Sequence, residues 1–342
     1  MKFAHTAAPH WLGANSVAIM MRRVLIALLP TLALSTWFLG VGILINTIFA
    51  CLLCWLLEVI ALYLRQRPVM MYANDGSALI TALLIALAIP PLMPWWVTAC
   101  ACLFAIVFAK HLYGGLGYNI FNPAMVGYVV VLISFPEYLA KWPTPAETTA
   151  GFMYTFDIFL HGRPSHELIT DALSGATPLD NIKMQLIQMH TINEILNQNS
   201  FGWLAGRGWE WINIAALIGG LWLLAKKVIR WQIPFAMLAT MTLLYGIFYI
   251  NDSSTQPSPL IGLFSGGTML AAFFVATDPV SAATSDRGRL IYGCGIGALC
   301  YAIRTWGSYP DGIAFAVLLM NMAAPLIDRY TLPRIYGHKN KP

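Results

Sequence analysis

Long apolar runs, separated by short polar stretches, dominate the pattern of residues along the chain. Each run approaches the roughly 20 residues that an α-helix needs to cross a bilayer. The pattern therefore predicts an all-α polytopic membrane protein with ten transmembrane helices, five on either side of one long polar interval. The predicted helices lie at about 22–38, 41–63, 77–92, 95–112, 122–138, 211–226, 232–250, 259–277, 289–304 and 311–328.

These helices divide the chain into four regions. A first five-helix membrane repeat covers 1–138, a long loop covers 139–210, a second five-helix repeat covers 211–328, and a tail covers 329–342. Because five is an odd number, the second half is flipped relative to the first. Any relation between the two halves is therefore an inverted repeat.

Two of the predicted helices are short and similar to each other. The run at 77–92 ends at Pro90-Pro91, the run at 259–277 ends at Asp278-Pro279, and small polar residues begin both. Paired short segments interrupted by Gly and Pro mark the usual binding site of inverted-repeat membrane proteins. Ordinary helix ends give the same pattern, so the sequence leaves both interpretations open.

Composition and charge agree with a membrane protein. The 342 residues are 58% hydrophobic and only 10% charged, with a mean hydropathy of +0.66, whereas soluble domains carry about 25% charged residues. The net charge of +5 does not indicate a nucleic-acid partner, because the basic residues lie at helix ends. No small-residue cleavage site follows the first apolar run, so no cleavable signal peptide is expected.

The basic residues also orient the predicted helices. Fifteen of the twenty Lys and Arg residues fall on one side of the membrane when the helices alternate in direction. The positive-inside rule then predicts cytoplasmic termini and a 139–210 loop on the outer side.

Neither the cysteines nor the histidines form a convincing metal site. All six cysteines lie in apolar runs and are interpreted as small buried hydrophobes. Cys51-x-x-Cys54 has the spacing of a metal or redox motif, but no second Cys or His pair lies nearby in the sequence. The histidines of the loop, His161, His166 and His190, are scattered.

The loop contains a stretch of small residues, Ser174-Gly175-Ala176-Thr177, with Asp171 and Asp180 on either side. It presents a single threonine hydroxyl, and small neighbours allow a bulky group to approach Thr177 closely. By itself, such a stretch is usually only a turn.

Ionisable residues at the membrane boundary are costly and are therefore functional candidates. Asp75 and Asp278 lie at corresponding ends of the two short helices. A carboxylate at such a place binds a cation in transit or caps a helix, and Pro279 suits a first helical position. The sequence does not choose between these roles. The candidates by position are Glu58, Asp75, Asp278, Asp311 and Asp328.

Two amides precede the fifth predicted helix, at its cytoplasmic end. Asn119 and Asn122 lie three residues apart beside Phe121, and Pro123 follows. Amides next to an aromatic ring suit a flat heterocyclic ligand, although the same arrangement is also typical of a helix cap.

Taken together, these stretches resemble the D subunits of the Rnf (also called Rsx) complexes, which are related to the B subunits of the sodium-pumping NADH:quinone oxidoreductases. The resemblance covers nearly the whole chain. The motifs that carry it are Lys110 through Gly117, Asn119 through Pro123, Ser174 through Asp180, Thr277 through Ser281, Asp286 through Arg289, Tyr309 through Gly312 and Ala324 through Asp328.

The resemblance implies a flavin-carrying membrane subunit of an ion-translocating electron-transport complex in a bacterial inner membrane. In this family the threonine of Ser-Gly-Ala-Thr carries FMN through a phosphoester bond, which a flavin transferase makes on the outer side. Here that residue is Thr177. Thr268 follows a similar stretch but has Gly267 before it and lies in an apolar run, so we reject it as the attachment site.

The resemblance also implies a second, non-covalent flavin (riboflavin) at Asn119 and Asn122. It places a cation route at Asp278 and Asp328, and at Asp75, where the relative has Glu. Its implied partners are subunits A, B, C, E and G, of which G carries FMN. Charge on a flavin is expected to bias a gate between the two repeats.

The predicted architecture alone fits other functions. Inverted five-helix repeats also serve channels for urea or ammonium, and a plain membrane anchor for partner subunits needs no chemistry. Covalent flavin is the feature that separates these functions, because neither a channel nor an anchor requires it.

Overall fold

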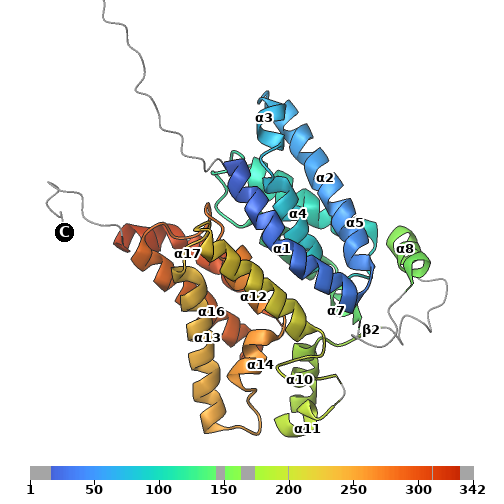
Figure 1. The fold of residues 1–342 in the computed structure, drawn as a ribbon, viewed down its shortest axis with the longest axis vertical. Coiled ribbons are helices and arrows are strands. Elements are labelled where there is room, and N and C mark those ends of the chain that lie inside the picture. The colour runs from blue at the N-terminus through green and yellow to red at the C-terminus, as the bar shows by residue number, and fades with distance from the viewer. Residues whose placement is uncertain (1–16, 144–150, 163–173, 199, 310, 332–342) are drawn as a thin grey trace, which may run out of the picture.

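The structure is a computed structural model that describes residues 17–143, 151–162, 174–198, 200–309 and 311–331. The described chain is mostly helical, and the helices of its two halves lie side by side (Figure 1). Asp171 and His166, both named in the sequence analysis, lie outside the described residues.

The helices of the first half follow the predicted runs with one correction. The run at 122–138 is two helices, because Pro136 cannot donate the backbone hydrogen bond that would continue the first. The elements are α1 (Val17–Leu39), α2 (Gly42–Leu64), α3 (Val69–Ala73), α4 (Ser77–Ala88), α5 (Trp95–Leu103), the π-helix η1 (Phe104–His111), α6 (Pro123–Ser134) and α7 (Pro136–Ala140).

The second half also has five helical segments in the predicted places, and again one differs. The run at 259–277 is broken after Phe264 and resumes at Thr268, with Gly266 at a φ of +61° between them. The elements are α12 (Trp209–Ala225), α13 (Gln232–Asn251), α14 (Pro259–Phe264), α15 (Thr268–Leu270), the π-helix η2 (Ala271–Val275), α16 (Asp286–Trp306) and α17 (Ile313–Thr331).

The polar interval between the halves has structure of its own. It contains α8 (Phe152–His161), α10 (Pro178–Ile187) and α11 (Ile192–Leu196), together with a two-residue antiparallel pair of β1 (Trp142–Pro143) and β2 (Ser174–Gly175). In Figure 1, α10 and α11 lie at the bottom of the molecule, away from the start of α1 and the end of α17.

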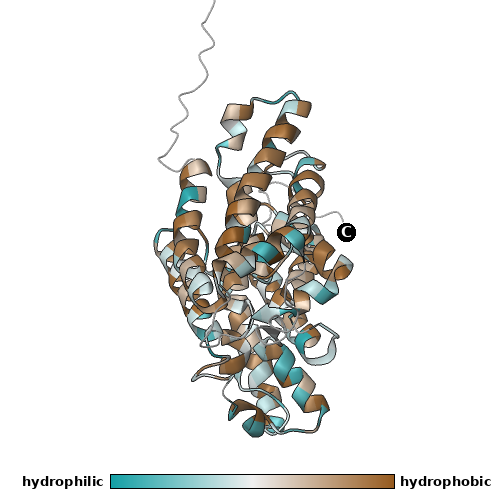
Figure 2. Cartoon of the chain, turned by 90° about the vertical axis from the view of Figure 1, so that its right-hand side faces the viewer, coloured by the Kyte–Doolittle hydropathy of each residue, from teal (hydrophilic) through white to brown (hydrophobic). Residues whose placement is uncertain are grey.

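The helices are those of a polytopic membrane protein. By length and composition, α1, α2, α13 and α17 are each able to cross a membrane. The helices α4, α5 with η1, α6 and α12 are apolar but shorter. In Figure 2 most of the long helices are brown, the colour of hydrophobic residues. The organisation of ten spans as two inverted repeats stays a prediction.

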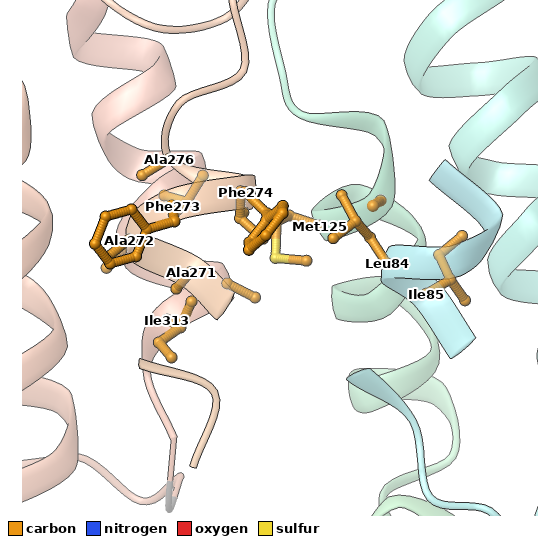
Figure 3. Packing of buried hydrophobic residues seen from close by; sticks show 14 of the residues in the cluster. Leu84, Ile85, Met125, Ala271, Ala272, Phe273, Phe274, Ala276 and Ile313 are labelled. Atoms are coloured by element: carbon orange, nitrogen blue, oxygen red, sulfur yellow. The ribbon is translucent and has the colours of Figure 1, made fainter. Parts of the chain in front are cut away.

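One hydrophobic core joins the two halves. Leu84 and Met125 of the first half face Phe274 of the second half in Figure 3, and all three are buried. The free cysteines agree with this core only in part. Cys54, Cys102 and Cys300 are buried as expected and Cys51 and Cys100 are half-buried, but Cys294 is exposed and that expectation is wrong.

The helices α1 and α12 of the two halves pack against each other, and this close contact depends on a glycine. A Cβ atom added to Gly219 would collide with the carbonyl oxygen of Ala27. We expect Gly219→Ala to lower the free energy of unfolding by roughly 1–3 kcal/mol, as other overpacked substitutions do. Thermal unfolding in detergent measures this change.

Gly246→Ala is the matched control, because a Cβ atom there meets only Pro259, at 3.9 Å. Within α13 it is expected to stabilise by up to about 1 kcal/mol through helix propensity. Equal effects of the two substitutions would contradict the close approach of α1 and α12.

Candidate functional site

The Ser-Gly-Ala-Thr stretch is a strand end that leads into a helix cap. Trp142 pairs with Gly175 and Pro143 pairs with Ser174, which fixes the start of the stretch. Thr177 then adopts an extended conformation and is the N-cap of α10. Pro178 fills the first helical position, where a missing N–H has no cost.

The hydroxyl of Thr177 is bound to Asp180. Oγ1 of Thr177 accepts a hydrogen bond from the backbone N–H of Asp180 at 3.2 Å and donates to its carboxylate Oδ2 at 2.8 Å. Burial raises the pKa of the Asp180 carboxyl above its usual range, while the hydrogen bonds from Thr177 act in the opposite direction. Thr177 itself is half-buried, so its hydroxyl is not enclosed by the protein.

Thr177 and Asp180 line a cavity of about 300 Å³ that lies between the two halves of the chain. Tyr128, Trp142, Trp209 and Tyr309 give it aromatic walls, and the rings of Trp142 and Trp209 lie 5.0 Å apart. Its remaining lining residues are Leu87, Ala88, Met125, Leu132, Pro136, Leu139, Ala140, Leu179, Gly266, Gly267, Leu270, Ala271, Val275, Asp311, Ile313 and Ala314.

Lys183 fastens α10 to the second half. Its ammonium group donates hydrogen bonds to the carbonyl oxygens of Gly307 and Tyr309, in the connection between α16 and α17. Burial lowers the pKa of the Lys183 ammonium. The lysine therefore holds Thr177, one turn and a half earlier on the same helix, at the rim of the cavity.

The rejected threonine, Thr268, is enclosed. It has no exposed surface, and its hydroxyl donates to the carbonyl of Ser265 at 3.0 Å and accepts from Arg304 at 3.0 Å. This burial agrees with the rejection of Thr268 as an attachment site.

The three carboxylates of the expected cation route all accept hydrogen bonds. Asp75 accepts at 2.7 Å from the backbone N–H of Ser77, the first residue of α4, although Gly76 occupies the N-cap position itself. This hydrogen bond favours the capping interpretation. Asp278 accepts from the hydroxyl of Ser281 at 2.7 Å. No helix begins at Pro279, which lies in a turn, so the structure does not support the capping alternative for Asp278.

The third carboxylate, Asp328 on α17, accepts from the backbone N–H and the hydroxyl of Thr284, at 2.9 and 3.0 Å. Asp278 and Thr284 lie near the two ends of the connection between η2 and α16. Asp278 therefore lies in this connection and Asp328 is hydrogen-bonded to it, whereas Asp75 lies in the first half of the chain. Within the described residues, none of the three forms an ion pair.

The side-chain amides of Asn119 and Asn122 differ in how many of their polar atoms have a hydrogen-bond partner. Asn122 caps α6 by accepting from Ala124 and Met125, and its amide nitrogen donates to the carbonyl of Val275 at 3.1 Å. Asn119 donates to the carbonyl of Phe121, but its side-chain oxygen is buried without a hydrogen-bond partner in the described residues.

Glu58 is the centre of a buried charged cluster that the sequence analysis did not assemble. Lys110 donates to its carboxylate at 2.7 Å and to the hydroxyl of Ser77 at 2.8 Å, and the side chains of both charged residues are 2–3% exposed. Nε2 of His111 lies 3.1 Å from the same carboxylate oxygen. The cluster ties α2, α4 and η1 together.

We expect Glu58→Gln to lower the free energy of unfolding by about 3–5 kcal/mol, because it leaves the Lys110 charge buried without its partner. Thermal unfolding in detergent measures the loss. Glu137→Gln is the control: Glu137 pairs with Lys141 at the surface, with side chains 78% and 47% exposed, where a pair contributes less than about 1 kcal/mol. A similar loss in both variants would show that the buried Glu58–Lys110 pair contributes no more to the free energy of unfolding than a surface pair does.

Several site residues were missed from the sequence because they are basic. Lys110, Lys183 and Arg304 were counted only for topology, yet each is bound to groups on other elements. Lys110 and Arg304 lie inside helices of apolar regions, and a charge in such a place is the feature that would have revealed them.

Comparisons with known proteins point to one family. A model of the NQR2, RnfD, RnfE family matches residues 4–337. A protein of Aliivibrio salmonicida is 48% identical in an alignment of 349 positions that covers 99% of each chain. Proteins of Vibrio cholerae and Pseudomonas aeruginosa are each 49% identical, over 99% of this chain and 100% and 97% of their own. All three are named as D subunits of an ion-translocating oxidoreductase complex.

Proposed function

Since the chain belongs to the NQR2, RnfD, RnfE family, we propose that it is the flavin-carrying membrane subunit of an ion-translocating oxidoreductase complex of the Rnf type. Its partners are the other subunits of that complex, A, B, C, E and G, and a flavin transferase that matures it. The complex lies in a bacterial inner membrane. The observation that carries the proposal is the placement of Thr177 at the rim of an aromatic cavity.

Thr177 holds FMN through a phosphoester bond in this proposal. Two features of the site suit a phosphate group. The N-terminus of α10 supplies backbone N–H groups and the positive end of a helix dipole, both of which favour an anion. The small residues Gly175 and Ala176 leave space beside the hydroxyl.

The cavity beside Thr177 suits the flat ring of the flavin. Its volume of about 300 Å³ lies at the lower end of the range typical of small-molecule sites, about 300–1,000 Å³, and its walls are mostly apolar and aromatic. When bound, the isoalloxazine ring accepts and donates electrons. The chain's own contribution is to tether the ring at Thr177 and to exclude water around it with Trp142 and Trp209.

A second, non-covalent flavin is proposed near Asn119 and Asn122. Asn119 fits this role better, because its buried side-chain oxygen has no partner among the described residues and is free to accept from a ligand. Asn122 acts on the site only indirectly, since both ends of its amide are already used in capping α6 and in binding Val275.

The ten helical runs form two inverted repeats in this proposal, with the termini cytoplasmic and the 139–210 loop periplasmic. Two features support it. The first span of one half packs on the first span of the other, as α1 on α12, and the fifth on the fifth, as α6 on α17. The fourth span of each half also ends in a buried cation that donates to a hydroxyl of the third, as Lys110 to Ser77 and Arg304 to Thr268.

Flavin fluorescence of the denatured protein tests the proposed function. The full chain is produced with and without the flavin transferase, separated by denaturing electrophoresis and viewed under ultraviolet light. We expect a fluorescent band only with the transferase. A dark band in the presence of an active transferase would remove covalent flavin and favour the urea- or ammonium-type channel, which solute-flux assays would then test.

A further inference from the structure

The break in the second half is held by side chains rather than by helical hydrogen bonds. Between α14 and α15 the backbone cannot continue its helical pattern, and buried polar groups of the main chain must find other partners. Asn213 donates to the carbonyls of Phe264 and Gly266 and accepts from the N–H of Met269. Arg304 donates to the carbonyl of Gly262 at 2.8 Å.

Asp311 completes this arrangement from the connection between α16 and α17. Its Oδ1 accepts from the guanidinium group of Arg304 at 3.0 Å, and its Oδ2 accepts from the backbone N–H of Gly267 at 3.2 Å. The Arg304 side chain is 3% exposed and the Asp311 side chain is 26% exposed. The arginine is thus enclosed, while the carboxylate reaches the surface of a space.

That space is the cavity beside Thr177. Asp311, Gly266 and Gly267 all line it, so the carboxylate that binds the break also faces the cavity. The other charged lining residue among those described is Asp180, which lies beside the Thr177 oxygen that would bear the phosphate, whereas Asp311 is hydrogen-bonded to the break itself. A ligand in the cavity therefore contacts the Asp311 carboxylate, which is hydrogen-bonded directly to the break between α14 and α15.

We propose that Asp311 is a contact residue for the flavin ring in this cavity, and that it transmits the charge of the ring to the break between α14 and α15. Arg304 is the positioning residue that holds the carboxylate. The inference rests on the proposed function, because it requires flavin tethered at Thr177. Beyond the proposed function, it identifies Asp311 as the residue through which reduction of the flavin changes the structure of the membrane-embedded helices.

The direction of the effect follows from charge. Two electrons from the donor of the complex and one proton from water give a reduced ring with one more negative charge than the oxidised ring. That charge repels the Asp311 carboxylate and competes with it for the Arg304 and Gly267 donors. The hydrogen bond from Gly267 is then weakened, which loosens the start of α15. From there η2 leads within a few residues to Asp278.

The first test is the redox equilibrium of the covalent flavin in the purified full chain. Removing the carboxylate charge by Asp311→Asn favours the reduced ring. At a fixed potential we expect the ratio of reduced to oxidised flavin to rise roughly fivefold or more, because the carboxylate charge no longer opposes the charge of the reduced ring. Glu194→Gln is the control, because Glu194 is an exposed acid of α11 that does not line the cavity.

The second test needs no variant at Asp311 and so does not depend on how that variant folds. Hydrogen exchange of the 262–270 segment is compared between the oxidised protein and the dithionite-reduced protein. We expect faster exchange at Gly267 and in α15 after reduction, and no change in Thr177→Ala, which carries no tethered ring. Flavinylated wild-type protein whose exchange is the same in both states, or an unchanged redox ratio in Asp311→Asn, would overturn the inference. Absence of flavin from the wild-type protein would instead contradict the proposed function.

Discussion

Thr177→Ala is expected to remove the covalent flavin completely, so that the denatured band is dark even when the transferase is present. The phosphoester bond needs a hydroxyl oxygen, and alanine has none. The second threonine of the same type, Thr268, is no substitute, because it has no exposed surface and its hydroxyl is bound to Ser265 and Arg304. Electron transfer through the assembled complex is expected to fall with the loss of the tether, since the ring is no longer held near its donor and acceptor.

The variant is expected to fold. Loss of the cap at the start of α10 costs about 0.5–2 kcal/mol, which is small beside the packing of the helices. Thr177→Ser is the matched control, because serine keeps both the hydroxyl and the capping hydrogen bond and is expected to retain fluorescence. A bright band in Thr177→Ala would mean that flavin is attached at another residue. Normal activity of a complex containing a flavin-free Thr177→Ala chain would favour a plain membrane anchor.

Sequence pattern predicted the places of the helices well because apolar run length is a property of consecutive residues. It could not predict where those runs break. The break at Gly266 is stable only because Asn213 and Asp311, each more than 40 residues away, supply the missing hydrogen bonds. The sequence also left open whether Asp278 caps a helix at Pro279, and the structure has a turn there, in which Asp278 accepts from Ser281.

The motif of the candidate site could be predicted from the sequence, but the cavity around it could not. The Ser-Gly-Ala-Thr stretch gave the residue, while the cavity beside it combines side chains from β1, α6, α12 and the connection before α17. Contacts such as that of Asn122 with Val275, which are 153 residues apart, have no trace in local pattern. The buried cations Lys110 and Arg304 also escaped, because basic residues were used only to orient the helices.

Asp278→Asn is expected to lower ion transport by the assembled complex roughly tenfold or more, which corresponds to about 1.4 kcal/mol of lost interaction with the cation. The physical reason is that Asp278 is a carboxylate at the end of a broken helix with only Ser281 as its side-chain partner among the described residues. It therefore keeps acceptor capacity for a cation, in contrast to Glu58, whose charge is compensated by Lys110. Ion uptake into vesicles that contain the complex measures the effect.

Flavin attachment separates a transport role of Asp278 from a structural one. Asp278 lies in the connection after η2, whereas Thr177 begins α10 at the cavity rim, so the Asp278→Asn chain is expected to show the wild-type fluorescent band. Asp286→Asn is the control, because Asp286 is an exposed acid that pairs with Arg230 and Arg289, and a surface pair of this kind contributes little. Loss of the fluorescent band in Asp278→Asn would show that the carboxylate serves folding, and unchanged ion uptake would remove it from the cation route.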